Sequence, residues 1–233
     1  MLKMLSQLKQ DLNKLEHKEK TKILQRFFKT NKGEYGEGDI FLGIKVPEQR
    51  KIANKYDLNL KQIQELLSSK IHEYRLTALF TLIQKYKKAN QTEKQEIFNF
   101  YLKNTNNINN WDLVDLSAPK ILGDYLLNKE RTTIYQLAKS NNLWENRISI
   151  LSTYQFIKNN QFEDTLNISK ILLTNKHDLI HKAVGWMLRE IGKKDLQILE
   201  QFLKQHHKQM PRTMLRYSIE KFSKAKRKVY LTR

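Results

Sequence analysis

The tract NNWDLVDLSAP holds the residues whose types and spacing are best suited to chemistry. Trp111 and Asp115 are four residues apart, so on a helix they share one face, with Asp112 turned aside. Each also has a structural reading when taken alone, because tryptophan usually fills a core and aspartate near a helix start usually caps it. Asn110 is placed to cap this helix and Ser117 to cap the next. These caps leave Asp115 without an evident structural task, and it is our candidate catalytic carboxylate.

Two residues from later segments complete the candidate site. Arg147 lies in WENRIS and Trp186 in KAVGWMLRE. Indole faces attract cations, a carboxylate stabilises an oxocarbenium ion or orients the attacking water, and an arginine binds phosphate through a bidentate fork. Together these groups suit cleavage of an N-glycosidic bond at a base that is already positively charged. Such a base leaves without a general acid, so one carboxylate suffices where a neutral glycoside needs two.

A weak internal repeat indicates how these residues are positioned. Five similar segments begin at intervals of 40, 33, 34 and 32 residues, at Ile71, Trp111, Trp144, Asp178 and Met210. Other amphipathic segments, such as TEKQEIFNFYLKN and FEDTLNISKILL, lie between them. A helix pair every 30-odd residues is typical of an α-solenoid of the HEAT type. We therefore expect an all-α, right-handed superhelix of HEAT-like repeats, one domain over residues 1–233. Its concave basic cleft would bring the four candidate residues together.

Apolar periodicity and proline positions support helices. A stripe at steps of three and four consists of Ile71, Tyr74, Ala78, Leu82 and Tyr86, with Arg75, Gln84 and Lys87 mostly outside it. Each of the three prolines stands where a helix should begin, at Pro47, Pro119 and Pro211. The tract GEYGEGDIFLGIKV carries four of the seven glycines, which predicts a structured loop or a short hairpin.

Composition excludes several classes of protein. With 7 glycines and 3 prolines the chain is too poor in turn residues for an all-β sandwich. The absence of cysteine excludes disulfides, thiolate metal sites and a cysteine nucleophile. The first residues are charged throughout and no apolar run reaches 18 residues, so we expect a cytoplasmic protein with no membrane partner, nucleoid-associated when bound to DNA.

Charge indicates the partner. The chain has 43 Lys and Arg against 24 Asp and Glu, a formal charge of +19, and residues 204–233 hold ten basic residues and one acid. This excess favours DNA or RNA, although a generically basic, lysine-rich protein is the alternative. We expect a monomer that binds double-stranded DNA. The candidate DNA contacts are Arg147, Lys182, Arg189, Arg212 and Arg216.

Other chemistries find little support. His177 and His181 have metal-ligand spacing, but no third ligand is clustered with them, so a helix-terminal and a surface histidine are the better interpretation. The glycine-rich tract follows no predicted strand and lacks a P-loop Lys-Ser/Thr, and no GxSxG motif occurs. We expect no metal and no cofactor.

The sequence resembles the AlkD-type HEAT-like-repeat DNA glycosylases, which are DNA alkylation repair enzymes. The resemblance covers nearly the whole chain and is clearest in FLGIKVPEQRK, NNWDLVDLSAP, WENRISIL and HKAVGWMLREIGKKD. It implies that Trp111, Trp186 and Asp115 are catalytic and that Arg147 binds DNA. It also implies excision of N3- and N7-alkylpurines from duplex DNA while the lesion stays largely stacked. Phe27 or Phe28 replaces the family's tyrosine near the N-terminal helices. Two alternatives to a monofunctional glycosylase are a non-catalytic binder of damaged or branched DNA and a HEAT-type scaffold for protein or RNA.

Overall fold

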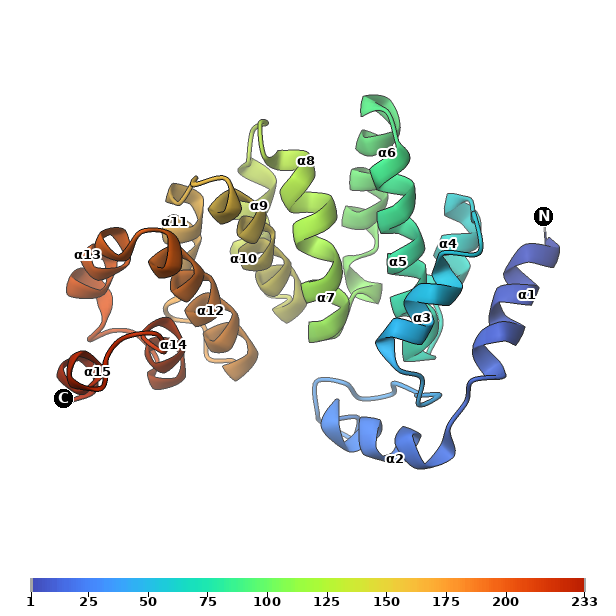
Figure 1. The fold of residues 1–233 in the computed structure, drawn as a ribbon, viewed down its shortest axis with the longest axis horizontal. Coiled ribbons are helices and arrows are strands. Elements are labelled where there is room, and N and C mark those ends of the chain that lie inside the picture. Colours follow the sequence, from blue (N-terminus) through green and yellow to red (C-terminus); the bar gives the residue numbers. More distant parts are fainter. Residues whose placement is uncertain (1, 233) are drawn as a thin grey trace. The chain divides into compact units, whose positions relative to one another are not determined.

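The computed structural model describes residues 2–232 as helices joined by short loops (Figure 1). Within that range the extended structure is limited to one isolated parallel bridge between Ile40 and Ile71. The predicted all-α fold of stacked helices is therefore confirmed. Among the same residues, no helix is long and apolar enough to cross a membrane.

The chain divides into two compact units, Met1–Ser117 and Ala118–Arg233. Unit 1 contains α1 (Leu2–Asn13), α2 (Lys18–Phe27), α3 (Val46–Ala53), α4 (Leu60–Leu67), α5 (His72–Lys88), α6 (Gln91–Lys103), the short 3₁₀ helix η1 (Thr105–Asn107) and α7 (Trp111–Ala118), which reaches the boundary. Unit 2 contains the π-helical turn η2 (Pro119–Gly123), α8 (Asp124–Leu126), α9 (Thr132–Ala138), α10 (Leu143–Lys158), α11 (Glu163–Leu172), α12 (Asp178–Lys194), α13 (Leu196–His206), α14 (Arg212–Ser218) and α15 (Lys224–Leu231). The single domain and the concave basic cleft stay predictions.

The repeated segments correspond to helices as predicted. They supply α5, α7, α10, α12 and α14, and the two intervening amphipathic segments supply α6 and α11. Within unit 2, α10 packs on α12, which packs in turn on α14. Gly185 of α12 permits this close approach, because a Cβ there would lie 2.5 Å from the carbonyl oxygen of Met214. In unit 2 these three helices therefore pack one on the next, as a stacked repeat requires.

The predicted stripe of α5 is buried, with Tyr74, Ala78, Leu82 and Tyr86 at most 7% exposed. Arg75 is 4% exposed although it lies outside the stripe, because its guanidinium pairs with the buried carboxylate of Asp39 at 2.7 Å. An ion pair thus replaces apolar packing on one side of α5.

Two of the prolines stand at helix starts, and the third does not. Pro47 is in the first turn of α3, and Pro211 directly precedes α14. The prediction for Pro119 was wrong, because the helical run passes through it from α7 into η2. Proline lacks an N–H and crowds the preceding turn, and a wider π-helical turn accommodates both effects. Since no new helix starts there, Ser117 is not a cap, and its hydroxyl donates instead to the carbonyl of Leu113.

The glycine-rich tract forms a loop with turns and no hairpin. After turns over residues 32–38 the chain runs extended, and Ile40 pairs with the start of α5. The carboxylate of Glu73 accepts hydrogen bonds from the backbone N–H groups of Leu42, Gly43 and Ile44, at 2.9, 2.9 and 3.3 Å. The carboxylate of Glu73 therefore accepts the backbone hydrogen bonds that the second strand of a hairpin would otherwise have accepted.

Candidate functional site

Helix α7 places Trp111 and Asp115 one turn apart, and both side chains are half-buried. The side-chain oxygen of Asn110 accepts a hydrogen bond from the Trp111 N–H at 2.8 Å, so the predicted role of Asn110 at the helix start is confirmed. The spacing of four residues puts the indole and the carboxylate on one face of α7. Unit 1 thus brings together two of the four candidate residues.

Aromatic rings hold Trp111 in place. The ring of Phe28 stacks on the indole, with centroids 5.1 Å apart and planes 8° apart. Phe27 meets the same indole edge-on, at 5.8 Å and 78°. Phe28 is buried whereas Phe27 is 60% exposed, so one of the two residues packs in the core and the other faces solvent. Sequence comparison alone left open which of them replaces the family's tyrosine, and the structure places both beside Trp111.

Asp112, which lies off the face of α7 that carries Trp111 and Asp115, has contacts of its own in the interior. It is buried, and its carboxylate lies 2.8 Å from Nε2 of His72. Nδ1 of His72 lies 3.1 Å from the carboxylate of Asp39, which also accepts from Arg75 and from the Asn110 amide. We call His72, Arg75, Asp39 and Asp112 the buried ionic network. Sequence reasoning missed it, although the run HEYR at the start of an apolar helix was a signal that charge would be buried there.

The electrostatics of this network follow from its geometry. Burial alone would lower the pKa of His72, but the carboxylates of Asp112 and Asp39 outweigh it and raise the pKa to about 9. Burial would raise the pKa of Asp39, but hydrogen bonds and charge from His72 and Arg75 outweigh that effect and lower it. The imidazole is therefore a cation that donates from both nitrogens, and it ties α7 to α5 and to the loop at Asp39.

The negative charge of Asp115 acts on the phenol of Tyr101. Tyr101 is fully buried, and its hydroxyl is 2.7 Å from that of Ser117. Burial raises the pKa of Tyr101, and the negative charge of Asp115 raises it further. This phenol stays protonated, so it adds no negative charge to the face that carries Asp115.

The other two candidate residues lie in unit 2. Arg147 is buried, and its guanidinium donates to the carbonyl oxygen of Leu179 at 2.5 Å. The indole N–H of Trp186 donates to Glu190 at 3.1 Å, and its ring centroid is 6.2 Å from that of Tyr154. The structure thus gives each residue a local partner. The convergence of all four candidate residues in one cleft stays a prediction.

The remaining candidate DNA-binding residues lie in unit 2, and three of them contact residues of the same unit. Lys182 pairs with Asp178 at 2.7 Å, and Arg189 pairs with Glu220. Arg212 donates to the carbonyl of Leu231 at 2.7 Å. Arg216 is exposed and lines a polar cavity of about 380 Å³. Their contacts with DNA stay predictions.

The histidine pair at the start of α12 has structural partners. His177 is the N-cap, and its Nδ1 accepts from the N–H of Leu179 at 3.2 Å, which confirms the helix-terminal interpretation. His181 is half-buried rather than a surface residue, with Nε2 2.6 Å from the carbonyl oxygen of Asn175. Within residues 2–232, no group of three or more His, Asp or Glu side chains is placed to hold a metal ion.

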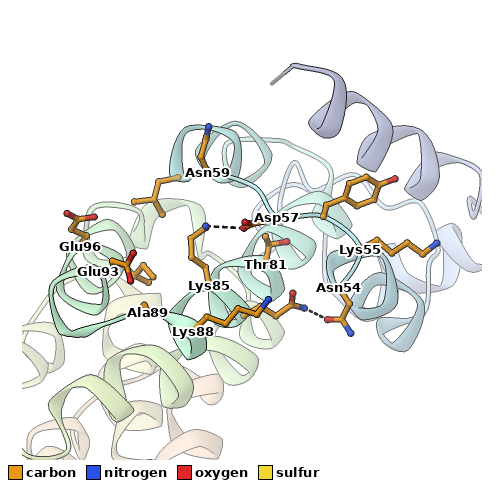
Figure 2. Close-up of a pocket in the computed structure, with 14 residues that line it drawn as sticks. Asn54, Lys55, Asp57, Asn59, Thr81, Lys85, Lys88, Ala89, Glu93 and Glu96 are labelled. Atoms are coloured by element: carbon orange, nitrogen blue, oxygen red, sulfur yellow. Dashed lines mark hydrogen bonds and ion pairs between the residues drawn. The ribbon is translucent and has the colours of Figure 1, made fainter.

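A cavity of about 500 Å³ lies elsewhere in unit 1, where the loop after α3 meets the end of α5 and the start of α6. Figure 2 shows Asp57 bonded to Lys85 across it, at 3.0 Å. Its polar residues carry both charge signs, with Lys88 on one side and Glu93 and Glu96 on another. None of the predicted catalytic residues lines it.

Comparison with known proteins assigns the family. The family described as DNA alkylation repair enzyme matches residues 8–222 of the chain. The chain belongs to this DNA alkylation repair enzyme family. A solved structure described as a predicted DNA alkylation repair enzyme from Enterococcus faecalis has the same fold, with a TM-score of 0.70 at 18% identity over 90% of this chain and 97% of that chain. The protein is accordingly an enzyme of DNA alkylation repair, and DNA is its substrate.

One curated protein matches a short part of this repair enzyme. The mitochondrial ATPase synthesis protein 25 of Vanderwaltozyma polyspora is 35% identical over 69 residues. The match spans 29% of this chain and only 11% of that protein, so it carries no argument about the activity.

Proposed function

We propose that this DNA alkylation repair enzyme is a monofunctional glycosylase that releases positively charged N3- and N7-alkylated purines from duplex DNA. The observation that carries the proposal is the different environment of the two aspartates of α7. Asp112 is buried against His72, whereas Asp115 is half-buried on the face that carries Trp111. This contrast supports a structural role for Asp112 and the catalytic role proposed for Asp115.

The reaction needs little from the protein. The bond from C1′ to N9 of the alkylated purine breaks, and its electron pair passes to the purine ring, where it neutralises the positive charge of the departing base. Asp115 stabilises the oxocarbenium ion that remains on the sugar and orients the water that adds to C1′. The proton lost by that water passes to the carboxylate or to solvent. No general acid is required, because the base already leaves as a neutral molecule.

The other predicted residues bind the substrate around this step. Trp111 and Trp186 pack against the deoxyribose and backbone beside the lesion, where their faces favour positive charge. Arg147 contacts a phosphate, which positions the duplex without reading its sequence. Arg147→Ala should therefore weaken binding to all duplexes equally. Its folding must be checked in parallel, since the guanidinium also donates to the carbonyl of Leu179.

Single-turnover release of alkylated purine from methylated duplex DNA tests the proposal with two variants that each remove one negative charge. Asp115→Asn should slow excision at least tenfold, which corresponds to about 1.4 kcal/mol of transition-state stabilisation. Asp57→Asn is the matched control, because the Asp57 side chain is 89% exposed and pairs with Lys85 at 3.0 Å. It should leave excision unchanged. Duplex affinity should survive in both variants.

Three results would count against this proposal. Unchanged excision by folded Asp115→Asn would remove the catalytic role of this carboxylate. Tight duplex binding by wild-type protein that releases no base would favour the non-catalytic DNA binder. Wild-type protein that neither excises a base nor binds duplex DNA would favour the HEAT-type scaffold for protein or RNA.

A further inference from the structure

We propose that the buried pair of His72 and Asp112 positions the proposed active site: it fixes the orientation of the first turn of α7, so that Trp111 and Asp115 point toward the substrate. The inference rests on the proposed function, because it concerns the same two residues of α7. His72 and Asp112 are 2% and 6% exposed, so both act through the helix. They are positioning residues rather than catalytic ones.

The imidazole of His72 is anchored at the start of α5. The His72 N–H donates to the carbonyl of Ile40 at 2.8 Å, and the Ile40 N–H donates to the carbonyl of Lys70 at 3.0 Å. These two hydrogen bonds form the parallel bridge that joins the start of α5 to the loop between α2 and α3 (Figure 1). Nδ1 of the ring lies 3.1 Å from the carboxylate of Asp39 in the same loop. Both the backbone and the side chain of His72 are therefore held by groups outside α7.

Polar contacts connect this anchor to the first turn of α7. Nε2 of His72 lies 2.8 Å from the carboxylate of Asp112, the second residue of the helix. The carboxylate of Asp39 accepts a hydrogen bond from the side-chain amide of Asn110 at 3.3 Å. The side-chain oxygen of Asn110 in turn accepts from the N–H of Trp111 at 2.8 Å. The ion pair and this chain of hydrogen bonds therefore reach two successive residues of α7.

Phe28 makes a third connection, through aromatic rings. Its centroid lies 5.0 Å from that of the His72 imidazole and 5.1 Å from that of the Trp111 indole, on which it stacks. Phe28 is 7% exposed and has little room to turn. A displacement of the imidazole is therefore transmitted to the indole through one ring.

The ion pair supplies a direction that apolar packing of α7 does not. Leu113 and Val114 are fully buried, but apolar burial is non-directional, whereas a hydrogen bond constrains both distance and angle. Successive residues of a helix are about 100° apart around its axis. A carboxylate held at Asp112 therefore fixes the directions in which Trp111 and Asp115 point. Replacing a buried ion pair by apolar side chains is often neutral for stability, so the role proposed for this pair is orientation.

Substitution of Asp112 tests the proposal through the separation of excision rate from DNA affinity. Asp112→Ala and Asp112→Leu each remove the acceptor that faces Nε2 of His72, and leucine does so without leaving a cavity. In both variants the single-turnover rate at saturating protein should fall at least about tenfold, because small misplacements of reacting groups are costly. Duplex affinity should stay at the wild-type value. Asp112→Asn keeps an acceptor oxygen for His72 and should excise faster than both.

Asp164→Ala is the matched control for lost stability. It removes a carboxylate that pairs with Arg131 in unit 2, where the two side chains are 16% and 18% exposed. This variant should have a lower melting temperature and an unchanged excision rate at a temperature where it is folded. Equal slowing by Asp164→Ala and Asp112→Leu would assign the effect to stability and overturn the proposal.

Fluorine NMR of protein labelled with fluorotryptophan reads the position of Trp111 independently of excision. The chain has three tryptophans, and Trp111→Phe assigns the signal of Trp111. In Asp112→Leu this signal should broaden or split, whereas the signals of Trp144 and Trp186 should not change. In Asp112→Asn it should stay single and sharp.

The outcomes separate this proposal from the glycosylase reaction. Wild-type excision by folded Asp112→Leu, or a single sharp Trp111 signal in that variant, would overturn the positioning role. Asp112→Asn that excises no faster than Asp112→Leu would also overturn it. Wild-type protein that releases no base would overturn the glycosylase instead, and the Trp111 signal would then decide whether His72 and Asp112 orient α7.

Discussion

The ring of Phe28 lies parallel to the indole of Trp111, with 8° between their planes and 5.1 Å between their centroids. Phe28 also stacks on Phe41, and both of these rings lie against the imidazole of His72, with centroids 5.0 and 4.6 Å from it. The orientation of Trp111 therefore depends on groups that are distant in the sequence. This cluster of rings joins Trp111 of α7 to the buried ionic network of unit 1.

Substitution of Phe27 and of Phe28, one at a time, should show which of the two rings stabilises the fold. Phe28→Leu removes the stack from a buried ring and should lower the free energy of unfolding by about 1–3 kcal/mol. Phe27→Leu changes a ring that is 60% exposed and should cost less than about 0.5 kcal/mol. Urea denaturation measures both. Equal losses in the two variants would contradict the core role of Phe28.

Stability should decrease in mildly alkaline solution because of His72. The pKa of this imidazole is raised from 6.5 to about 9 in the folded protein. A raised pKa stabilises the fold fully below the unfolded value, and that contribution is lost as the pH rises through the folded one. The free energy of unfolding should therefore fall between pH 6.5 and 9 by roughly 3 kcal/mol.

Substitution of the imidazole tests that assignment. His72→Gln keeps a polar side chain but does not titrate, so thermal unfolding of this variant should show little change over the same pH range. His207→Gln is the control, since its ring lies against the backbone carbonyl of Leu203 and meets the ring of Tyr230 edge-on. It should keep the wild-type slope. An unaltered slope in His72→Gln would assign the effect to another group.

Two glycines of α12 should respond differently to alanine. At Gly185 a Cβ would lie 2.5 Å from the backbone carbonyl of Met214, so Gly185→Ala must push α14 away. At Gly192 the obstacle is the flexible end of Leu199, at 2.4 Å, which can rotate. The first variant should lower the melting temperature by several degrees. The second should change it little, because alanine's helix propensity, worth about 1 kcal/mol, offsets the repacking. The reverse order would contradict the close packing of α12 on α14.

Salt dependence should reveal which cations touch DNA. Arg216 is exposed on α14 and is one of the predicted DNA contacts. Arg216→Ala should reduce the slope of log K against log salt by about 0.9, the value for one phosphate contact. Lys61→Ala removes an exposed cation from α4 and should leave the slope unchanged. Identical slopes in Arg216→Ala and wild type would remove Arg216 from the interface.

The sequence by itself determined the features that depend on neighbours along the chain. Helical periodicity predicted α5, because apolar residues at steps of three and four must share a buried face. The spacing of Trp111 and Asp115 placed them on one face of α7 for the same reason. The surplus of basic residues indicated an anionic partner, and the family assignment agrees with it.

The tertiary structure alone decided which polar groups are buried and what they contact. The sequence set Asp112 aside from the face of Trp111 and Asp115, yet in the fold Asp112 is buried and pairs with His72, 40 positions away, whereas Asp115 is half-buried. Arg75 lies outside the apolar stripe of α5, and it is buried because the carboxylate of Asp39 pairs with its guanidinium. Periodicity identifies the face of a helix but not its neighbour. The pairing of buried charges depends on chain segments that only folding brings together.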